Sequence, residues 1–255
     1  MRKNTSETLF AGLLCVILSF SSINTVFSAC IDEAQPAVNW ANCDLSGIDM
    51  KNKNLVNAVF TGGIFNNADF SGAKLDNADF NFAKLENARF DGARMPNTRL
   101  VAVKAKGASF RETLLSNSRL SRSDFNHAVF TGIKAHNSNF YQARLESANF
   151  SDARLYKANF EDADLNHADF SRAKLNFSIF SGASIVNADF NNADLTKALL
   201  DHTDCQGTNF TKANLSKASF REASLEDAIF TEAVLSDTTW SNFKRCRASS
   251  IGVCE

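Results

Sequence analysis

Residues 148–175 read ANFSDARLYKANFEDADLNHADFSRAKL, and every fifth residue of this stretch is Phe or Leu, with Ala two positions before each one. An α-helix advances about 100° per residue, so a five-residue period spreads these side chains around its whole surface. In one continuous strand, an odd period moves them from one face to the other at each repeat. Because neither element buries this pattern, we expect the chain to turn a corner every five residues.

The period runs from Leu45 to Trp240 without a change of phase. All 40 positions numbered by multiples of five are apolar, and 25 of the residues two positions earlier are Ala. In the predicted unit, these two residues point inward, the residue between them points outward, and the two polar residues that follow form the corner. Phe dominates the multiples of ten and Leu the positions between them, so a coil with four sides stacks like on like. The sequence therefore predicts an all-β, quadrilateral parallel β-helix of about ten coils, roughly 48 Å long.

The segments ADFSGAKLDNADF (68–80) and ADLNHADFSRAKL (163–175) resemble the pentapeptide repeat family, whose consensus is A-(D/N)-L-x-x. The resemblance covers residues 41–240 and implies a right-handed solenoid. It implies little about activity, because the family is a scaffold with varied roles. Its best-known members bind DNA gyrase by imitating DNA; they are cytoplasmic and acidic, and they end in a dimerising helix. This chain, with a net charge of −1, fits a DNA-mimic inhibitor of a topoisomerase less well.

The N-terminus predicts export to the periplasm or the medium of a bacterium. A basic start at Arg2 and Lys3 precedes a short apolar run and small residues before Cys30, which is typical of a signal peptide. Alternatives are a retained membrane anchor and lipid attachment at Cys30. No transmembrane segment is expected after signal removal. The predicted domains are a signal peptide (1–29), an N-terminal cap (30–44), the repeat β-helix (45–240) and a C-terminal cap (241–255); the caps cover the exposed ends of the solenoid.

The cysteines agree with export. Four of them lie in two close pairs at the ends of the mature chain, and in an oxidising compartment we expect the disulfides Cys30–Cys43 and Cys246–Cys254. A loop of such length is worth about 3 kcal/mol in the chain-entropy model. Cys205 occupies a central position of the repeat and is predicted to be a buried, inert thiol.

Charge is unevenly distributed along the rod. Residues 91–160 carry 11 basic and 5 acidic residues, whereas residues 186–240 carry 4 basic and 9 acidic residues. The outward position on one Leu side predicts a column that we call the basic stripe, interrupted by Leu114; its members are Lys74, Arg94, Lys134, Arg154 and Lys174. Stacked like charges repel each other, so the basic stripe suggests a docking site for an anionic polymer such as an acidic polysaccharide. The alternative is an ordinary solvated surface.

Catalytic patterns are weak by comparison. His127 and His167 share a corner column two coils apart, about 10 Å, which is too far for one zinc ion. We expect no enzyme activity, no cofactor, no metal and no specific nucleic acid. The corner column Asn57, Asn77, Asn97, Asn117 and Asn137 predicts a structural ladder of amides. Around Pro96 the repeat weakens, which predicts a small kink or bulge.

The predicted function is therefore a non-enzymatic, exported scaffold that binds an anionic polymer or an envelope protein on the basic stripe. The alternative from another class is a purely structural component of the envelope or matrix, without a single ligand. These two differ in whether the surface is selective.

Overall fold

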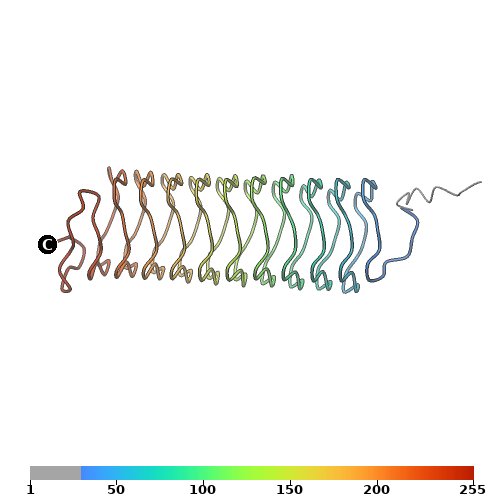
Figure 1. The fold of residues 1–255 in the computed structure, drawn as a ribbon, viewed down its shortest axis with the longest axis horizontal. Coiled ribbons are helices and arrows are strands. Elements are labelled where there is room, and N and C mark those ends of the chain that lie inside the picture. Colours follow the sequence, from blue (N-terminus) through green and yellow to red (C-terminus); the bar gives the residue numbers. More distant parts are fainter. Residues whose placement is uncertain (1–29) are drawn as a thin grey trace, which may run out of the picture.

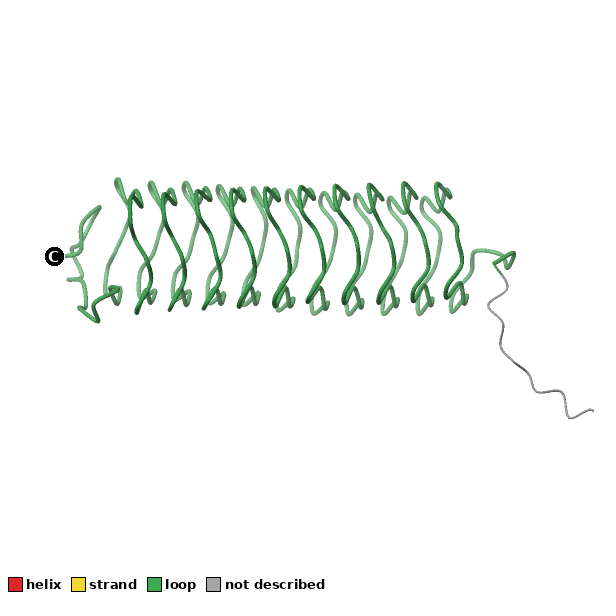
Figure 2. Cartoon of the chain, turned by 90° about the horizontal axis from the view of Figure 1, so that it is seen from above, coloured by secondary structure: helices red, strands yellow, loops and turns green. Residues whose placement is uncertain are grey.

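A computed structural model describes residues 30–255, and the predicted signal peptide, residues 1–29, lies outside the described residues. The described chain winds into a regular rod (Figure 1). Parallel bridges join each outward residue to the residue 20 positions later, from Asn39↔Val59 to Ser219↔Thr239. In residues 30–255 there is no helix or extended strand, because each side of a coil contributes a single bridge residue (Figure 2). The predicted 20-residue coil with four sides is thus present.

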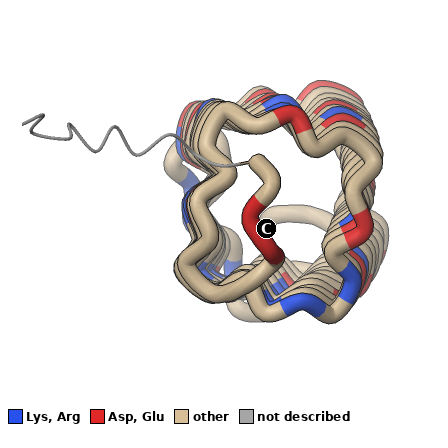
Figure 3. The backbone as a smooth tube through the Cα atoms, turned by 90° about the vertical axis from the view of Figure 1, so that its right-hand side faces the viewer, with Lys and Arg blue, Asp and Glu red and all other residues tan. Residues whose placement is uncertain are grey.

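Seen from its end, the rod has a four-sided outline (Figure 3). We name each face by the column of outward residues that bridge along it in steps of 20. Face C runs from Asp44 to Ser224, face D from Asp49 to Ile229, face A from Asn54 to Val234 and face B from Asn39 to Thr239. The chain visits the faces in the order C, D, A, B within each coil, so face A and face C lie on opposite sides of the rod.

Each corner is a tight turn whose second residue has a positive φ. At a representative corner, the Ala58 N–H donates to the Leu55 carbonyl at 3.1 Å, and Asn57 between them has φ 60°. Asn tolerates this left-handed conformation better than most side chains, which explains its frequency at the corners. The Leu55 N–H donates to the Lys74 carbonyl of the next coil at 2.7 Å. Turn bonds and bonds between coils together satisfy the backbone on each side.

The interior is filled by stacked phenylalanines. Phe150 stacks on Phe130 with ring centroids 4.7 Å apart and on Phe170 at 4.8 Å, and all three rings belong to face D. Phe160, from the opposite face B, meets Phe150 edge to face at 5.7 Å. Like side chains therefore stack from coil to coil, and the two Phe columns interlock across the core in the geometry that aromatic pairs prefer.

Hydroxyl side chains replace Ala at several inward positions and remain hydrogen-bonded. The buried Thr113 hydroxyl donates to the Phe90 carbonyl, 23 residues earlier, at 2.7 Å. The same bond to the residue 23 positions earlier is made by Ser118, Ser123, Ser138, Thr203, Thr208 and Thr238. A buried hydroxyl without a partner is costly, and these bonds remove that cost.

Of the small kink or bulge predicted near Pro96, the bulge is absent. Arg94 bridges to Leu114 and Arg99 bridges to Arg119 in the ordinary register, so no residue is inserted. Pro96 lies at the first corner position, where its carbonyl accepts from the Asn77 N–H at 3.0 Å and no ladder donor is lost. The large residue Val103 precedes the small central residue Ala105, and both are buried, so the core volume is conserved.

The ends of the rod are joined to the body by the terminal segments. Cys30 and Cys43 lie at disulfide distance, with S–S 2.03 Å, as do Cys246 and Cys254 at 2.08 Å. Near the C-terminus the bridges change direction: Val234↔Ile251 and Thr239↔Arg245 are antiparallel. Cys205 is buried and has no disulfide partner among residues 30–255, and burial raises the pKa of its thiol.

Candidate functional site: a basic stripe and its surroundings

The five residues of the basic stripe lie in one column on face A. Bridges join Lys74 to Arg94, then pass through Leu114 to Lys134, Arg154 and Lys174. All five basic side chains are exposed, whereas Leu114 is half-buried. Coils repeat at about 4.8 Å, so neighbouring positive charges stand at roughly this interval along the rod. Asn54 precedes the stripe in the column and Asp194 follows it, which bounds the stripe at both ends.

The basic stripe differs from most other arginines of the rod in having few ion pairs. Elsewhere on the rod, Arg99 pairs with Asp79, Arg221 with Asp201 and Arg172 with Asp152, each across neighbouring coils at 2.7–2.8 Å. Within the stripe, Arg94 pairs with Asp76 at 2.8 Å. Among the described residues, the other four members of the stripe form no ion pair. Their charges are therefore available to a ligand.

The gap in the stripe at Leu114 lies beside a cavity at the next corner. This cavity, of about 270 Å³, is lined by Asn97, Arg99, Asn117 and Arg119. The amide ladder runs through side-chain bonds from Asn77 to Asn57 and from Asn97 to Asn77, and again from Asn137 to Asn117. Between Asn97 and Asn117 no such bond forms in this part of the described chain. The predicted ladder is therefore present in two parts. Arg119, on face B, adds a positive charge to the lining of the cavity beside Leu114.

Aromatic side chains, which the repeat pattern does not predict, occupy the same corner further along the rod. Tyr156 and Phe177 are each more than a third exposed, and their ring centroids lie 5.5 Å apart. His136 approaches Tyr156 at 6.4 Å, and the Lys197 ammonium lies 4.8 Å from the Phe177 ring centre. In the sequence, these two residues could have been recognised because they are aromatic at corner positions where most repeats have polar residues.

The electrostatic effect of the stripe is visible at His136. Burial lowers the pKa of His136, and the positive charges of Arg154 and Lys134 lower it further. At Asp194, burial raises the pKa, but hydrogen bonds from Thr196 and Asn176 and the charge of Lys174 bring it below the usual value. The stripe thus creates a positive potential at the neighbouring corner and along its own column.

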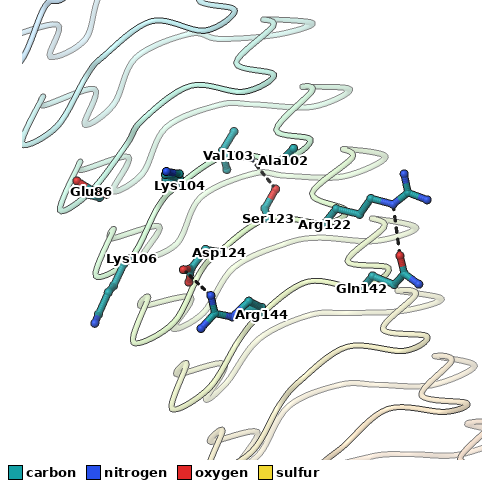
Figure 4. A pocket seen from close by; sticks show the side chains of 10 residues that line it. All are labelled: Glu86, Ala102, Val103, Lys104, Lys106, Arg122, Ser123, Asp124, Gln142 and Arg144. Carbon is teal, nitrogen blue, oxygen red and sulfur yellow. Dashed lines mark hydrogen bonds and ion pairs between the residues drawn. The ribbon is translucent and has the colours of Figure 1, made fainter.

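A second basic surface lies on face C. A pocket of about 610 Å³ spans this face from its corner with face B to its corner with face D (Figure 4). Its charged lining residues are Glu86, Lys104, Lys106, Arg122, Asp124 and Arg144. Lys84, Lys104 and Arg144 share this face because they are separated by multiples of 20 residues, but the repeat pattern gives no sign of a hollow.

No metal centre is found among residues 30–255, since no group of three or more His, Cys, Asp or Glu side chains is arranged to hold an ion. His127 and His167 fall two coils apart in one corner column, as the period requires. Within the same residues there is no helix with the length and apolar character needed to cross a bilayer.

Comparison with known families agrees with the architecture. The family model described as "Pentapeptide repeat region" matches residues 103–180. The model described as "Pentapeptide repeats (8 copies)" matches residues 39–77, 54–92, 64–100, 163–201, 178–216, 198–237 and 208–247. These matches reach from residue 39 to residue 247. No curated protein matches the sequence of this chain.

Solved structures that resemble this chain include three proteins. HetL, a pentapeptide repeat protein involved in heterocyst differentiation regulation in the cyanobacterium Nostoc, shares 23% identity over 84% of this chain and 93% of its own, with a TM-score of 0.47. A pentapeptide repeat protein from the Arabidopsis thaliana thylakoid lumen shares 34% identity over 38% of this chain and 68% of its own, with a TM-score of 0.38. QnrB1, a plasmid-mediated fluoroquinolone resistance protein, shares 18% identity over 74% of this chain and 92% of its own, with a TM-score of 0.44.

Proposed function

Because the chain belongs to the pentapeptide repeat family, we propose that it is an exported, non-enzymatic scaffold that docks an acidic polysaccharide along face A. The observation that carries this proposal is the basic stripe, in which four of the five cations form no ion pair among the described residues. We also propose that the rod winds right-handed in about ten coils. Its caps are residues 30–44 and residues 241–255.

The charge pattern favours a polymer over a small anion. A single exposed ion pair is worth about 0–1 kcal/mol, so one carboxylate on one lysine binds weakly. A chain with regularly spaced carboxylates meets several cations at once, and after the first contact the others form at high effective concentration. The exposed rings of Tyr156 and Phe177, at the corner beside the stripe, add an apolar surface that suits the flat faces of sugar rings.

Export is supported by the predicted signal peptide and by the two disulfide pairs, which are compatible with an oxidising compartment. We expect the mature protein in the periplasm or the medium. There it meets the carboxylate-rich polysaccharides of the envelope and matrix rather than nucleic acids.

The test measures the affinity of the mature protein for polygalacturonate by isothermal titration calorimetry at low salt. Reversing Lys134 and Arg154 to Glu weakens binding at face A by about tenfold or more, because it removes two contacts worth up to about 1 kcal/mol each and adds repulsion, and tenfold corresponds to about 1.4 kcal/mol. Both side chains are exposed, so the melting temperature stays close to that of the parent protein. The same two reversals at the exposed Lys212 and Lys217, near the acidic end of the rod, form the matched control and leave affinity nearly unchanged.

Salt dependence provides a second criterion. Contacts between exposed charges are screened over about 8 Å at physiological ionic strength, so the affinity falls as salt is added. Absence of salt-sensitive binding at low ionic strength contradicts the proposal and favours the alternative, a structural envelope component without a single ligand. A DNA-mimic role is disfavoured because residues 91–160 carry a net charge of +6, from 11 basic and 5 acidic residues.

A further inference from the structure

The pocket on face C holds cations that the protein itself does not neutralise. Asp124 pairs with Arg144 at 3.3 Å, and Glu86 accepts from the neutral Asn66 amide at 3.0 Å and keeps its negative charge, so the lining carries four cations against two carboxylates. Lys104 and Lys106 are exposed and form no ion pair among the described residues. The rim of the pocket therefore presents unpaired positive charge, as the basic stripe does.

A small residue, Ala102, lines the hollow at its corner with face B. Phe82, Ala102 and Arg122 occupy the same corner position in successive coils, so at the level of Ala102 a methyl group stands where its neighbours carry longer side chains. Below it, the buried Ser123 hydroxyl accepts from the Val103 N–H at 3.0 Å and donates to the Leu100 carbonyl at 2.6 Å. This hydroxyl is fully used, so recognition of a ligand falls to the cations of the rim, and those recognise carboxylates.

The two basic surfaces stand back to back. Face A and face C are opposite sides of the four-sided rod (Figure 3), and the packed Phe and Leu core lies between them. They also overlap along the rod: Lys104 and Arg144 of face C follow Arg94 and Lys134 of face A by ten residues, which is half a coil. A polymer chain extended along one face leaves the other face free.

We propose that the pocket on face C is a second binding surface for the acidic polysaccharide, so that one rod bridges two polymer chains. This inference rests on the proposed function, because the stripe on face A is taken as the first surface. It gives the scaffold a mechanical role, namely the cross-linking of carboxylate-bearing chains on opposite sides of a rigid rod.

The first measurement is the stoichiometry of a short oligogalacturonate by titration calorimetry. The parent protein binds two chains per rod. The variant Lys104→Glu/Lys106→Glu binds one, and so does Lys134→Glu/Arg154→Glu, while the combined variant binds none. The control Lys212→Glu/Lys217→Glu keeps both sites. Methyl-esterified oligogalacturonate, which lacks the charge, does not bind.

The second measurement is cross-linking of long polygalacturonate, followed by light scattering. The parent protein raises the scattering of the polymer, and either single-face variant loses this effect while it still binds the oligomer. The NMR pKa of His136 identifies the occupied face: a polyanion on face A offsets the charges of Arg154 and Lys134 and raises this pKa. In the face C variant the rise of the His136 pKa is retained.

The outcomes separate the two ideas. If one oligomer binds per rod, binding is lost with the face A variant, and the face C variant behaves as the parent does, the bridging inference is overturned and the proposed function stands. If no oligomer binds to any form, the proposed function and the bridging inference fall together.

Discussion

Phe140 and Phe160 stack face to face across one coil, with ring centroids 4.8 Å apart and planes 12° from parallel. Phe160 stacks in turn on Phe180 at 5.1 Å and meets Phe150 and Phe170 edge-on. It is fully buried, so its ring is held by neighbours above, below and across the core.

Replacing Phe160 with Ala is expected to lower the free energy of unfolding by about 3–5 kcal/mol, because the lost burial leaves a cavity that a stacked core cannot close. Phe160→Asp costs at least several kcal/mol, since it buries a charge without a partner. Denaturant unfolding measures both. Phe82→Ala is the matched control, because Phe82 is 65% exposed and its removal changes stability little. Equal effects at the two positions would contradict the assignment of the interior.

The corner ladder predicts an order of stability at Asn77. This residue donates to Asn57 and accepts from Asn97, and its φ is 58°. Asn77→Gly removes both side-chain hydrogen bonds, but glycine adopts the positive φ without strain. Asn77→Ala removes the same bonds and also holds Ala in a left-handed conformation, which costs roughly 1 kcal/mol. We expect the parent to be the most stable, then Gly, then Ala, by thermal unfolding. An Ala variant as stable as the Gly variant would show that the corner has relaxed.

The cysteines give a chemical test of the ends of the rod. Peptide mapping by mass spectrometry, after digestion without reduction, should show peptides joined through Cys30–Cys43 and Cys246–Cys254. Cys205 should resist alkylation in the native protein, because it is buried and burial raises the pKa of its thiol, so little thiolate exists. It reacts after unfolding. Rapid native labelling of Cys205 would be inconsistent with its place in the core.

Acid sensitivity is expected at Asp201. Burial raises the pKa of this carboxyl, but hydrogen bonds from Arg221 and Ser219 and the charge of Arg221 lower it below its usual value. A carboxyl with a lowered folded pKa contributes stability above its ordinary pKa of about 3.9, and this contribution is lost as the pH falls through the folded pKa.

Asp201→Asn should therefore be less stable than the parent at neutral pH, with a difference that shrinks below about pH 4. Unfolding free energies measured across this range test the prediction. Asp204→Asn is a control on the neighbouring face, because Asp204 forms no ion pair among residues 30–255. A difference at Asp201 that does not depend on pH would mean that the effect comes from packing rather than from charge.

The sequence by itself determined the architecture of the rod. The five-residue period is visible from a few successive repeats. Because it continues in phase from Leu45 to Trp240, it assigns Phe160, Leu165 and Cys205 to the interior and Lys134 to the surface. Every repeat needs an apolar central residue and a small residue two positions before it, so each additional repeat confirms the phase. The basic stripe is aligned because four sides of five residues each make a coil of 20 residues, so residues 20 positions apart lie on the same face.

Only the tertiary structure decided which of those surface charges are free. Arg94 and Lys134 occupy equivalent positions, yet Arg94 reaches Asp76 and Lys134 has no such partner among the described residues. The pocket beside Ala102 and the pairing of Tyr156 with Phe177 are likewise invisible in the repeat. The physical reason is that the period fixes where the backbone goes. A salt bridge, a hollow or a ring contact depends on which side-chain lengths and rotamers meet from one coil to the next.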